Sequence, residues 1–261
     1  MQNPYFIDTH SHIYYHEKEE LAGHIQRCKD NNIQKILMPN VDVKSIAQIK
    51  RTVQTFPEVC IPMMGLHPCS VKEDYKEQLA KIQKQIQKFE ICAIGEIGLD
   101  LHWDTSTLAW QKEAFEIQIQ WAIEHRLPID IHCRKAFDEI FEILEKEKKK
   151  NPSLHGIFHC FTGDLQQAQR AIDLGFLLGI GGIVTYKNAG LDKVVENIDL
   201  EHLILETDAP YLSPVPHRGK PNESSYLIHT AQKAADLKHV SLEEIAQKTT
   251  ENAIKIFKLK K

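Results

Sequence analysis

The chain has 261 residues, of which 42% are hydrophobic and 26% charged, and its formal net charge is −4. These values are typical of a soluble globular protein that is long enough for one large domain or two small ones. They exclude a protein that coats nucleic acid or a membrane surface through bulk positive charge. An anionic substrate would therefore have to be held by local groups or by metal.

The start of the chain and its cysteines indicate a cellular setting. Polar residues follow Met1 without a basic stretch and an apolar run, so we expect no secretory signal and no membrane span. The six cysteines are scattered without CxxC spacing, which predicts reduced thiols in a cytoplasmic protein. Cys133 and Cys160 each follow a histidine, and alternation along a strand would turn both thiols away from those histidines.

Apolar runs alternate with amphipathic helical patterns along the whole chain. The predicted strands are 7–12, 33–39, 59–66, 91–97, 127–133, 155–161, 176–180 and 203–207. The helical patterns between and after them cover 21–28, 46–56, 79–89, 110–121, 137–144, a helix ending at Gly175, a short helix at 192–197, and two closing helices. Without a linker or a composition break, this alternation predicts an α/β fold, a single (β/α)8 TIM-type barrel, as one domain over residues 1–261. A doubly wound open sheet shares the pattern and is the alternative.

The first candidate for chemistry is the segment Asp8-Thr9-His10-Ser11-His12. In an extended segment, side chains alternate between faces, so Asp8, His10 and His12 would point the same way. Two imidazoles on one face can reach a single ion, although a surface strand can also carry two histidines by chance. The metal interpretation therefore depends on further ligands elsewhere in the chain.

Further acidic and imidazole residues stand at the C-terminal ends of predicted strands. Together with the first pair they are His10, His12, His67, Glu96, His132, His159 and Asp208. In a barrel these ends converge on the face that holds active sites. Even without His67, four histidines and two carboxylates exceed what one tetrahedral ion needs. They suit two divalent ions that share a bridging carboxylate and leave a position for water.

Individual roles can be assigned within this set. Glu96 is the candidate bridge, and Asp208 would bind one metal and accept a proton from the attacking water, which makes both catalytic candidates. His67 precedes Pro68 and is equally compatible with a substrate contact or with stabilising a turn. Glu206 shares a face with Asp208, and we expect Glu206 and Asp8 to orient ligands from behind.

The motifs around these residues resemble those of the TatD-related deoxyribonucleases, a branch of the metal-dependent amidohydrolase superfamily. The matching motifs are His10-Ser11-His12, Gly65-Leu66-His67-Pro68, Gly95-Glu96-Ile97-Gly98-Leu99-Asp100, Ile131-His132-Cys133-Arg134, His159-Cys160-Phe161-Thr162-Gly163, Glu206-Thr207-Asp208-Ala209-Pro210-Tyr211-Leu212 and Arg218-Gly219-Lys220-Pro221-Asn222-Glu223. They run in order through essentially the whole chain. Two departures stand out: Ser224 occupies a position where proline is usual, and Leu101 occupies one where an aromatic is common, which removes a candidate for base stacking there.

The resemblance implies a TIM-type barrel that hydrolyses phosphodiester bonds in DNA with divalent metal. It implies metal ligands at His10, His12, Glu96, His132, His159 and Asp208. It also implies that His67 and Arg134 lie near the scissile phosphate, while Arg218 and Lys220 could add local positive charge. The negative net charge favours short or single-stranded ends over duplex, and we expect no membrane or obligate protein partner.

Two other functions and several metals remain open from the sequence. A small-molecule amidohydrolase or lactonase could use the same metal pair, and a non-catalytic metal-dependent binding protein is the third hypothesis. The positive charges at Arg134, Arg218 and Lys220 favour a phosphate-bearing substrate. Four imidazoles favour zinc, manganese, iron or cobalt, whereas the resemblance implies magnesium.

Overall fold

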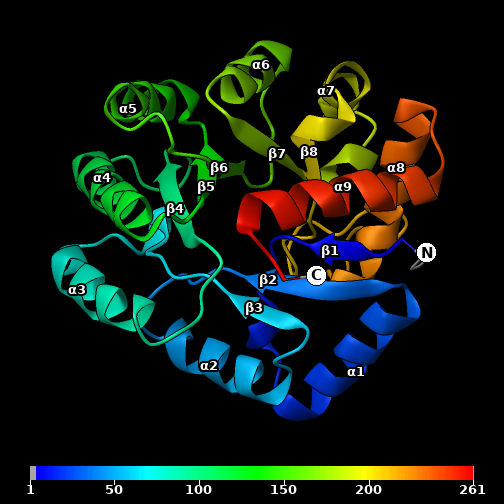
Figure 1. Cartoon of the computed structure of the whole chain (residues 1–261), viewed down its shortest axis with the longest axis horizontal. Helices are drawn as coiled ribbons and strands as arrows, with labels where there is room; N and C mark the ends of the chain where they lie inside the picture. The colour runs from blue at the N-terminus through cyan, green and yellow to red at the C-terminus, as the bar shows by residue number, and fades with distance from the viewer. Residues whose placement is uncertain (1–3, 261) are drawn as a thin grey trace.

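The structure, a computed structural model, describes residues 4–260, so Met1, on which the expectation about the start of the chain partly rests, lies outside it. Eight parallel strands alternate with helices along these residues (Figure 1). The strands are β1 (Phe6–Asp8), β2 (Ile33–Met38), β3 (Cys60–Pro62), β4 (Ile94–Asp100), β5 (Ile129–Arg134), β6 (Gly156–Phe158), β7 (Phe176–Ile180) and β8 (Leu203–Leu205). The α-helices are α1 (Lys18–Asp30), α2 (Ser45–Thr55), α3 (Tyr75–Ile86), α4 (Leu108–His125), α5 (Phe137–Lys150), α6 (Leu165–Asp173), α7 (Leu191–Asn197), α8 (Leu227–Lys238) and α9 (Leu242–Phe257).

Backbone hydrogen bonds close the strands into a ring. Strands β1 to β3 pair in one run and β4 to β8 in another, in chain order. At one seam the Thr9 N–H donates to the Leu205 carbonyl at 3.1 Å, which joins β1 to β8. At the other seam the Gly95 N–H donates to the Met64 carbonyl at 3.0 Å, which joins β3 to β4. The predicted (β/α)8 barrel is therefore confirmed, and the open doubly wound sheet is wrong because such a sheet would leave two unpaired edges.

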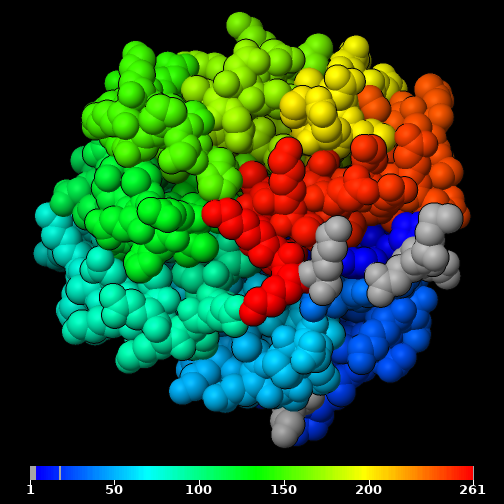
Figure 2. Space-filling view, viewed as in Figure 1, coloured from blue at the N-terminus to red at the C-terminus, as the bar shows by residue number. Residues whose placement is uncertain are grey.

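Helix α9 covers the end of the barrel at which the strands begin. The Thr250 hydroxyl donates to the Tyr5 carbonyl just before β1, and the Asn252 amide donates to the Leu203 carbonyl at the start of β8. Phe257 packs with Ile7, Ile157, Ile204 and other apolar residues of the barrel interior. Figure 1 shows α9 lying across this end, and Figure 2 shows it filling the middle of this face. The opposite end, where the strands finish, is the one left for a functional site.

The ends of the strands differ most from the sequence prediction. The sixth predicted strand, 155–161, pairs only over Gly156–Phe158, and Cys160 has a φ of 45°. Because its backbone has left the sheet, Cys160 does not follow strand alternation, and it lines a cavity beside the site together with Cys133. The prediction for the two thiols assumed that both segments are strands, and this assumption is wrong at Cys160, which lies beyond the end of β6. Trp110, the first residue of the predicted helical pattern 110–121, is 40% exposed.

None of the helices between residues 4 and 260 combines the length and the apolar character required to cross a bilayer.

Candidate metal centre

The predicted ligands converge at the end of the barrel where the strands finish. There a cavity of about 450 Å³ is lined by residues that lie in or follow β1, β2, β3, β4, β5, β6 and β8. The lining includes His12, His67, Glu96, His132, His159, Asp208 and Arg134, while His10 lies buried behind them. Segments up to about two hundred residues apart in the chain thus meet because each follows a neighbouring parallel strand.

Glu96, near the start of the second half of the barrel, stands at the centre of this arrangement. Its Oε1 lies 3.1 Å from Nε2 of His67 and 2.8 Å from Nδ1 of His132. The same oxygen lies 3.0 Å from Nε2 of His159. Three imidazole nitrogens from three different strand ends therefore surround one carboxylate oxygen.

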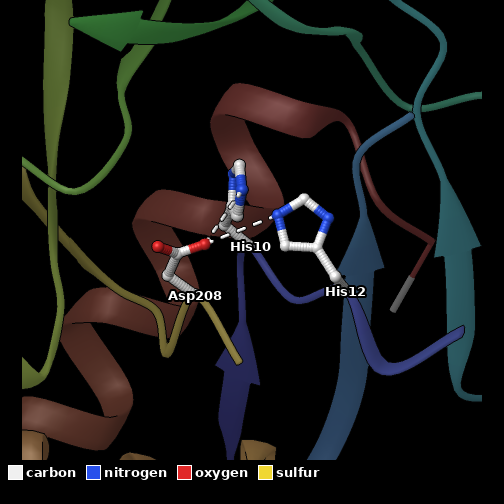
Figure 3. Close-up of side chains that lie close together, drawn as sticks. All are labelled: His10, His12 and Asp208. Atoms are coloured by element: carbon white, nitrogen blue, oxygen red, sulfur yellow. Dashed lines mark ion pairs between the residues drawn. The ribbon is translucent and has the colours of Figure 1, made fainter. Parts of the chain in front are cut away.

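The other oxygen of Glu96 faces a second cluster. Its Oε2 lies 3.3 Å from Nε2 of His10 and 3.7 Å from Nε2 of His12. The Asp208 Oδ1 lies 3.7 Å from the same atom of His10 and 3.5 Å from that of His12, and the three side chains point toward one another (Figure 3). Glu96 thus connects two clusters of ligand atoms, one on each oxygen.

The donor set fits divalent metal. Three groups of side chains each bring their ligand atoms within 4.8 Å of one another. The groups are His10, His12 and Asp208; His10, Glu96 and His159; and His67, Glu96 and His132. The buried Nε2 of His10 makes no hydrogen bond, although the opposite ring nitrogen does. A buried polar atom without a partner is costly, and an imidazole nitrogen directed at a carboxylate pair is a position that a metal ion satisfies.

The charges in the cluster favour ionised carboxylates. Burial raises the pKa of Glu96, but the neighbouring His67, His159 and His10 outweigh it and hold that pKa well below its ordinary value. The pKa of Asp208 is also lowered, because the hydrogen bond with His12 and the nearby imidazoles outweigh burial. Both carboxylates are therefore ready to bind a cation at neutral pH without losing a proton first.

Two aspartates that the sequence analysis gave no role hold the imidazoles in place. The buried Asp130 Oδ2 lies 2.8 Å from Nδ1 of His10, and the Asp100 Oδ2 lies 3.0 Å from Nε2 of His132. Carboxylates behind ligand histidines fix the ring orientation and raise the basicity of the other nitrogen. Asp130 stands two residues before His132, so strand alternation, as applied to the first strand, would have placed it on the same face as His132. Asp100 could have been noticed as the last residue of one of the quoted motifs.

The two residues expected to orient ligands behave differently from each other. The Glu206 Oε1 lies 3.4 Å from Nδ1 of His159, as expected for a carboxylate behind a ligand. Asp8 instead accepts hydrogen bonds from the backbone N–H and the hydroxyl of Thr207, at 3.0 and 2.6 Å. Burial raises the pKa of Asp8 to about 7. Asp8 therefore fixes the backbone immediately before Asp208, and Asp130 is the carboxylate behind the first histidine.

The candidate substrate contacts are divided between the cavity and its surroundings. Arg134 lines the main cavity and an adjoining one of about 220 Å³. Arg218 lies with its guanidinium carbon 4.1 Å from the centre of the Tyr186 ring, and neither it nor Lys220 lines these two cavities. His67 stabilises the turn, because its Nδ1 accepts from the Cys69 N–H at 3.0 Å. Its Nε2 faces Glu96, and its contact with substrate stays a prediction.

Comparison with known proteins decides the family. The family described as "TatD related DNase" matches residues 7–258, which is nearly the whole chain. The chain belongs to this family. A relative in Bacillus subtilis, "Uncharacterized metal-dependent hydrolase YabD", is 38% identical over 97% of this chain and 99% of its own length.

Solved structures agree with this family and with the fold. The TatD homologue YjjV from Escherichia coli is 27% identical, with a TM-score of 0.91 over 98% of both chains. The phosphotriesterase homology protein from E. coli, whose structure contains phosphate in its active site, is 12% identical with a TM-score of 0.76 and supports the barrel fold alone. The predicted family is confirmed, and this TatD-family chain is a metal-dependent hydrolase.

Proposed function

We propose that this TatD-family hydrolase cleaves phosphodiester bonds in DNA, at single-stranded or frayed ends, with two divalent ions. The observation that supports two ions is the position of Glu96, whose two oxygens face two separate clusters of ligand atoms. A carboxylate shared in this way is typical of two-metal hydrolases.

The residues divide naturally between two binding positions. His10, His12 and Asp208 would hold one ion beside Oε2 of Glu96. His132 and His159 would hold the other beside Oε1, with His67 close enough to contribute. When bound, such ions supply Lewis acidity toward a phosphate and lower the pKa of water. Predominantly imidazole ligands favour zinc or manganese over magnesium, and elemental analysis of protein purified without added metal would identify the ion.

The side chains of the protein then have distinct tasks. Asp208 remains ionised because its pKa is lowered, so its carboxylate can accept a proton from the attacking water. Glu96 also remains ionised and keeps the two clusters together. Arg134 enters the cavity with N–H groups that can bind two phosphate oxygens at once. Together these groups position a phosphodiester over the metal centre.

The choice of DNA ends over duplex rests on charge and size. Arg134 is the single lysine or arginine in the lining of the main cavity, as far as residues 4–260 show, and the whole chain has a net charge of −4. Duplex binding through phosphates requires many cations, because each neutralised phosphate contributes to affinity. A cavity of about 450 Å³ instead suits one small ligand or the end of a strand.

Replacement of the bridging carboxylate tests the proposal. Glu96→Gln and the control Glu90→Gln, at an exposed position paired with Lys260, would be stripped of metal, reloaded and assayed on a labelled single-stranded oligonucleotide. We expect Glu96→Gln to lose more activity than the roughly 10- to 100-fold that is lost when a residue supporting a metal ligand is substituted. Glu90→Gln should retain wild-type activity.

A parallel assay on cyclic amides and lactones separates the competing functions. Turnover of these compounds without cleavage of the oligonucleotide would refute the deoxyribonuclease proposal in favour of a small-molecule hydrolase. Metal binding without turnover of any substrate would favour a binding protein. Oligonucleotide cleavage that is unchanged in Glu96→Gln would show that the activity does not come from this centre.

A further inference from the structure

Large aromatic side chains surround the mouth of the metal-centre cavity and are open to solvent. Trp103 is 70% exposed, Tyr211 52% and Tyr15 38%, and all three line the cavity. Aromatic rings of this size normally bury most of their surface, and exposed ones gathered at a cavity are typical of a binding surface. Catalysis of hydrolysis does not by itself require any of them.

The aromatic residues lie on two opposite sides of the barrel. Trp103 follows β4, whereas Tyr211 follows β8 and Tyr15 follows β1. In a closed ring of eight strands in chain order, β8 stands opposite β4. Trp103 therefore follows the strand opposite the one that Tyr211 follows, and Glu96 and Asp208 line the same cavity.

Trp103 is fixed to the metal centre through its backbone. Its N–H donates to Oδ1 of Asp100 at 3.1 Å, and the other oxygen of that carboxylate lies 3.0 Å from His132. The Arg134 guanidinium carbon lies 5.3 Å from the centre of the Trp103 ring. A ring and a phosphate-binding cation are thus placed side by side at a set position relative to the ligands.

Tyr15 and Tyr211 are fixed on the opposite side by the other cluster. The Tyr15 ring stacks on the ring of His12, with centres 5.4 Å apart and planes 10° apart. The Tyr211 ring meets His12 edge-on at 5.9 Å. The amide of Asn222 donates to the Tyr211 carbonyl at 2.7 Å and holds this loop.

The small number of cations makes the aromatic rings important. Arg134 is the one lysine or arginine in the described lining of the cavity, so contacts to phosphates cannot hold a strand of several nucleotides. Stacking of bases on aromatic rings holds single strands without regard to sequence, because every base has a π-face. Leu101, where an aromatic was expected from the resemblance, lacks such a ring, and Trp103 supplies one two residues later.

We propose that Trp103 and Tyr211 stack against the bases on either side of the scissile phosphate and thereby select unpaired strand ends. This inference rests on the proposed deoxyribonuclease function. Stacking on both sides requires bases that are free of their partners, which excludes the interior of a duplex. Arg134, beside the Trp103 ring, then contacts the phosphate that joins the two nucleotides.

The test compares two substrates and matched tryptophan variants. One substrate is a single-stranded oligonucleotide, and the other is the same strand with abasic nucleotides at the last two positions of both ends. The variants are Trp103→Ala, Trp103→Phe and the control Trp110→Ala, which removes another partly exposed tryptophan that does not line the cavity. Trp103→Ala keeps the backbone N–H that binds Asp100, so the support of His132 is retained.

We expect Trp103→Ala to raise KM for the intact strand by about 5- to 150-fold, which corresponds to the usual contribution of one stacked base to binding. On the abasic strand the same variant should change KM by less than about 2-fold, because no base is present to stack. Trp103→Phe should restore most of the loss, Trp110→Ala should match the wild type, and Tyr211→Ala should behave as Trp103→Ala does.

Other outcomes overturn the inference. An equal effect of Trp103→Ala on both substrates would show that the ring supports the loop and does not stack on a base, and no effect on either would show that it does neither. If the wild type cleaves neither strand, the proposed function fails. Stacking is then decided separately by fluorescence anisotropy with labelled strands and metal-loaded protein, where equal affinity for intact and abasic ends refutes it.

Discussion

The aspartate behind His10 provides a demanding test of how the metal centre is built. The Asp130 Oδ2 accepts from Nδ1 of His10 at 2.8 Å, and both side chains are completely buried. This contact leaves Nε2 of His10 free to face Glu96 and Asp208. We expect Asp130→Asn to weaken metal binding by about 10-fold and Asp130→Ala by up to about 100-fold, or about 1.4 to 2.7 kcal/mol.

The two substitutions differ in what they leave behind. Asparagine retains an oxygen that can accept from His10, but its amide group would replace Oδ1, an atom that has no hydrogen-bond partner. Burying that donor without an acceptor would lower the free energy of unfolding by about 1 to 3 kcal/mol. Alanine removes the contact entirely, so the ring of His10 would lose its fixed orientation.

Metal affinity is measured by competition with a fluorescent chelator. The values of kcat and KM are measured on a single-stranded oligonucleotide. Asp138→Asn, at an exposed position in the first turn of α5, is the control for loss of one carboxylate. We expect a lower kcat at subsaturating metal with partial recovery when metal is added in excess. Wild-type affinity and wild-type kcat in both Asp130 variants would refute the argument that this carboxylate orients the ligand.

Three further predictions concern metal and packing. Chelation should lower Tm by about 5 to 10 °C relative to protein with metal at 100 times its Kd. At that concentration the ion stabilises the folded state by about 2.7 kcal/mol, and each kcal/mol shifts Tm by about 2 to 4 °C for a chain of this size. An unchanged Tm in differential scanning calorimetry would contradict this prediction. Burial lowers the pKa of His10, but Asp130 and Glu96 raise it to about 10, so the ring is protonated at pH 7 and metal must displace that proton. Metal affinity should therefore rise with pH, and calorimetry in buffers of different ionisation enthalpy should detect proton release; binding without release would show that the ring is already neutral. Gly179→Ala should lower activity without abolishing folding, because a Cβ at this position would overlap the carboxylate of Glu206 behind His159. Full activity in the oligonucleotide assay would show that Glu206 has room to move.

The sequence predicted the order of the elements because their signals are local. Helical spacing of apolar residues such as Ile46, Ile49 and Val53 corresponds to α2, and the apolar run Phe176–Ile180 is β7 as expected. Repetition of these local patterns indicated the barrel, and the family motifs supported it. Strand ends were the least accurate, as Cys160 shows, because a positive φ at a strand end leaves no clear trace in apolar alternation.

The candidate ligands were found for a related reason. In a barrel, the C-terminal ends of all strands meet, so residues such as His10, Glu96 and Asp208 could be grouped before any distance was known. Their partners could not be assigned in the same way. Which carboxylate lies behind which imidazole depends on how neighbouring strands are offset, and the contact between Asp130 and His10 joins strands that are not neighbours in the ring.

The sequence by itself determined the class of fold, the family and the residue types that can hold metal, since these depend on local periodicity and on motifs. The tertiary structure alone decided that the two oxygens of Glu96 face different clusters and that Asp8 supports Thr207. It also decided that Trp103 and Tyr211, which follow opposite strands of the barrel, line the same cavity. These are relations between atoms on separate strands, and only the closure and packing of the barrel fix the distances between them.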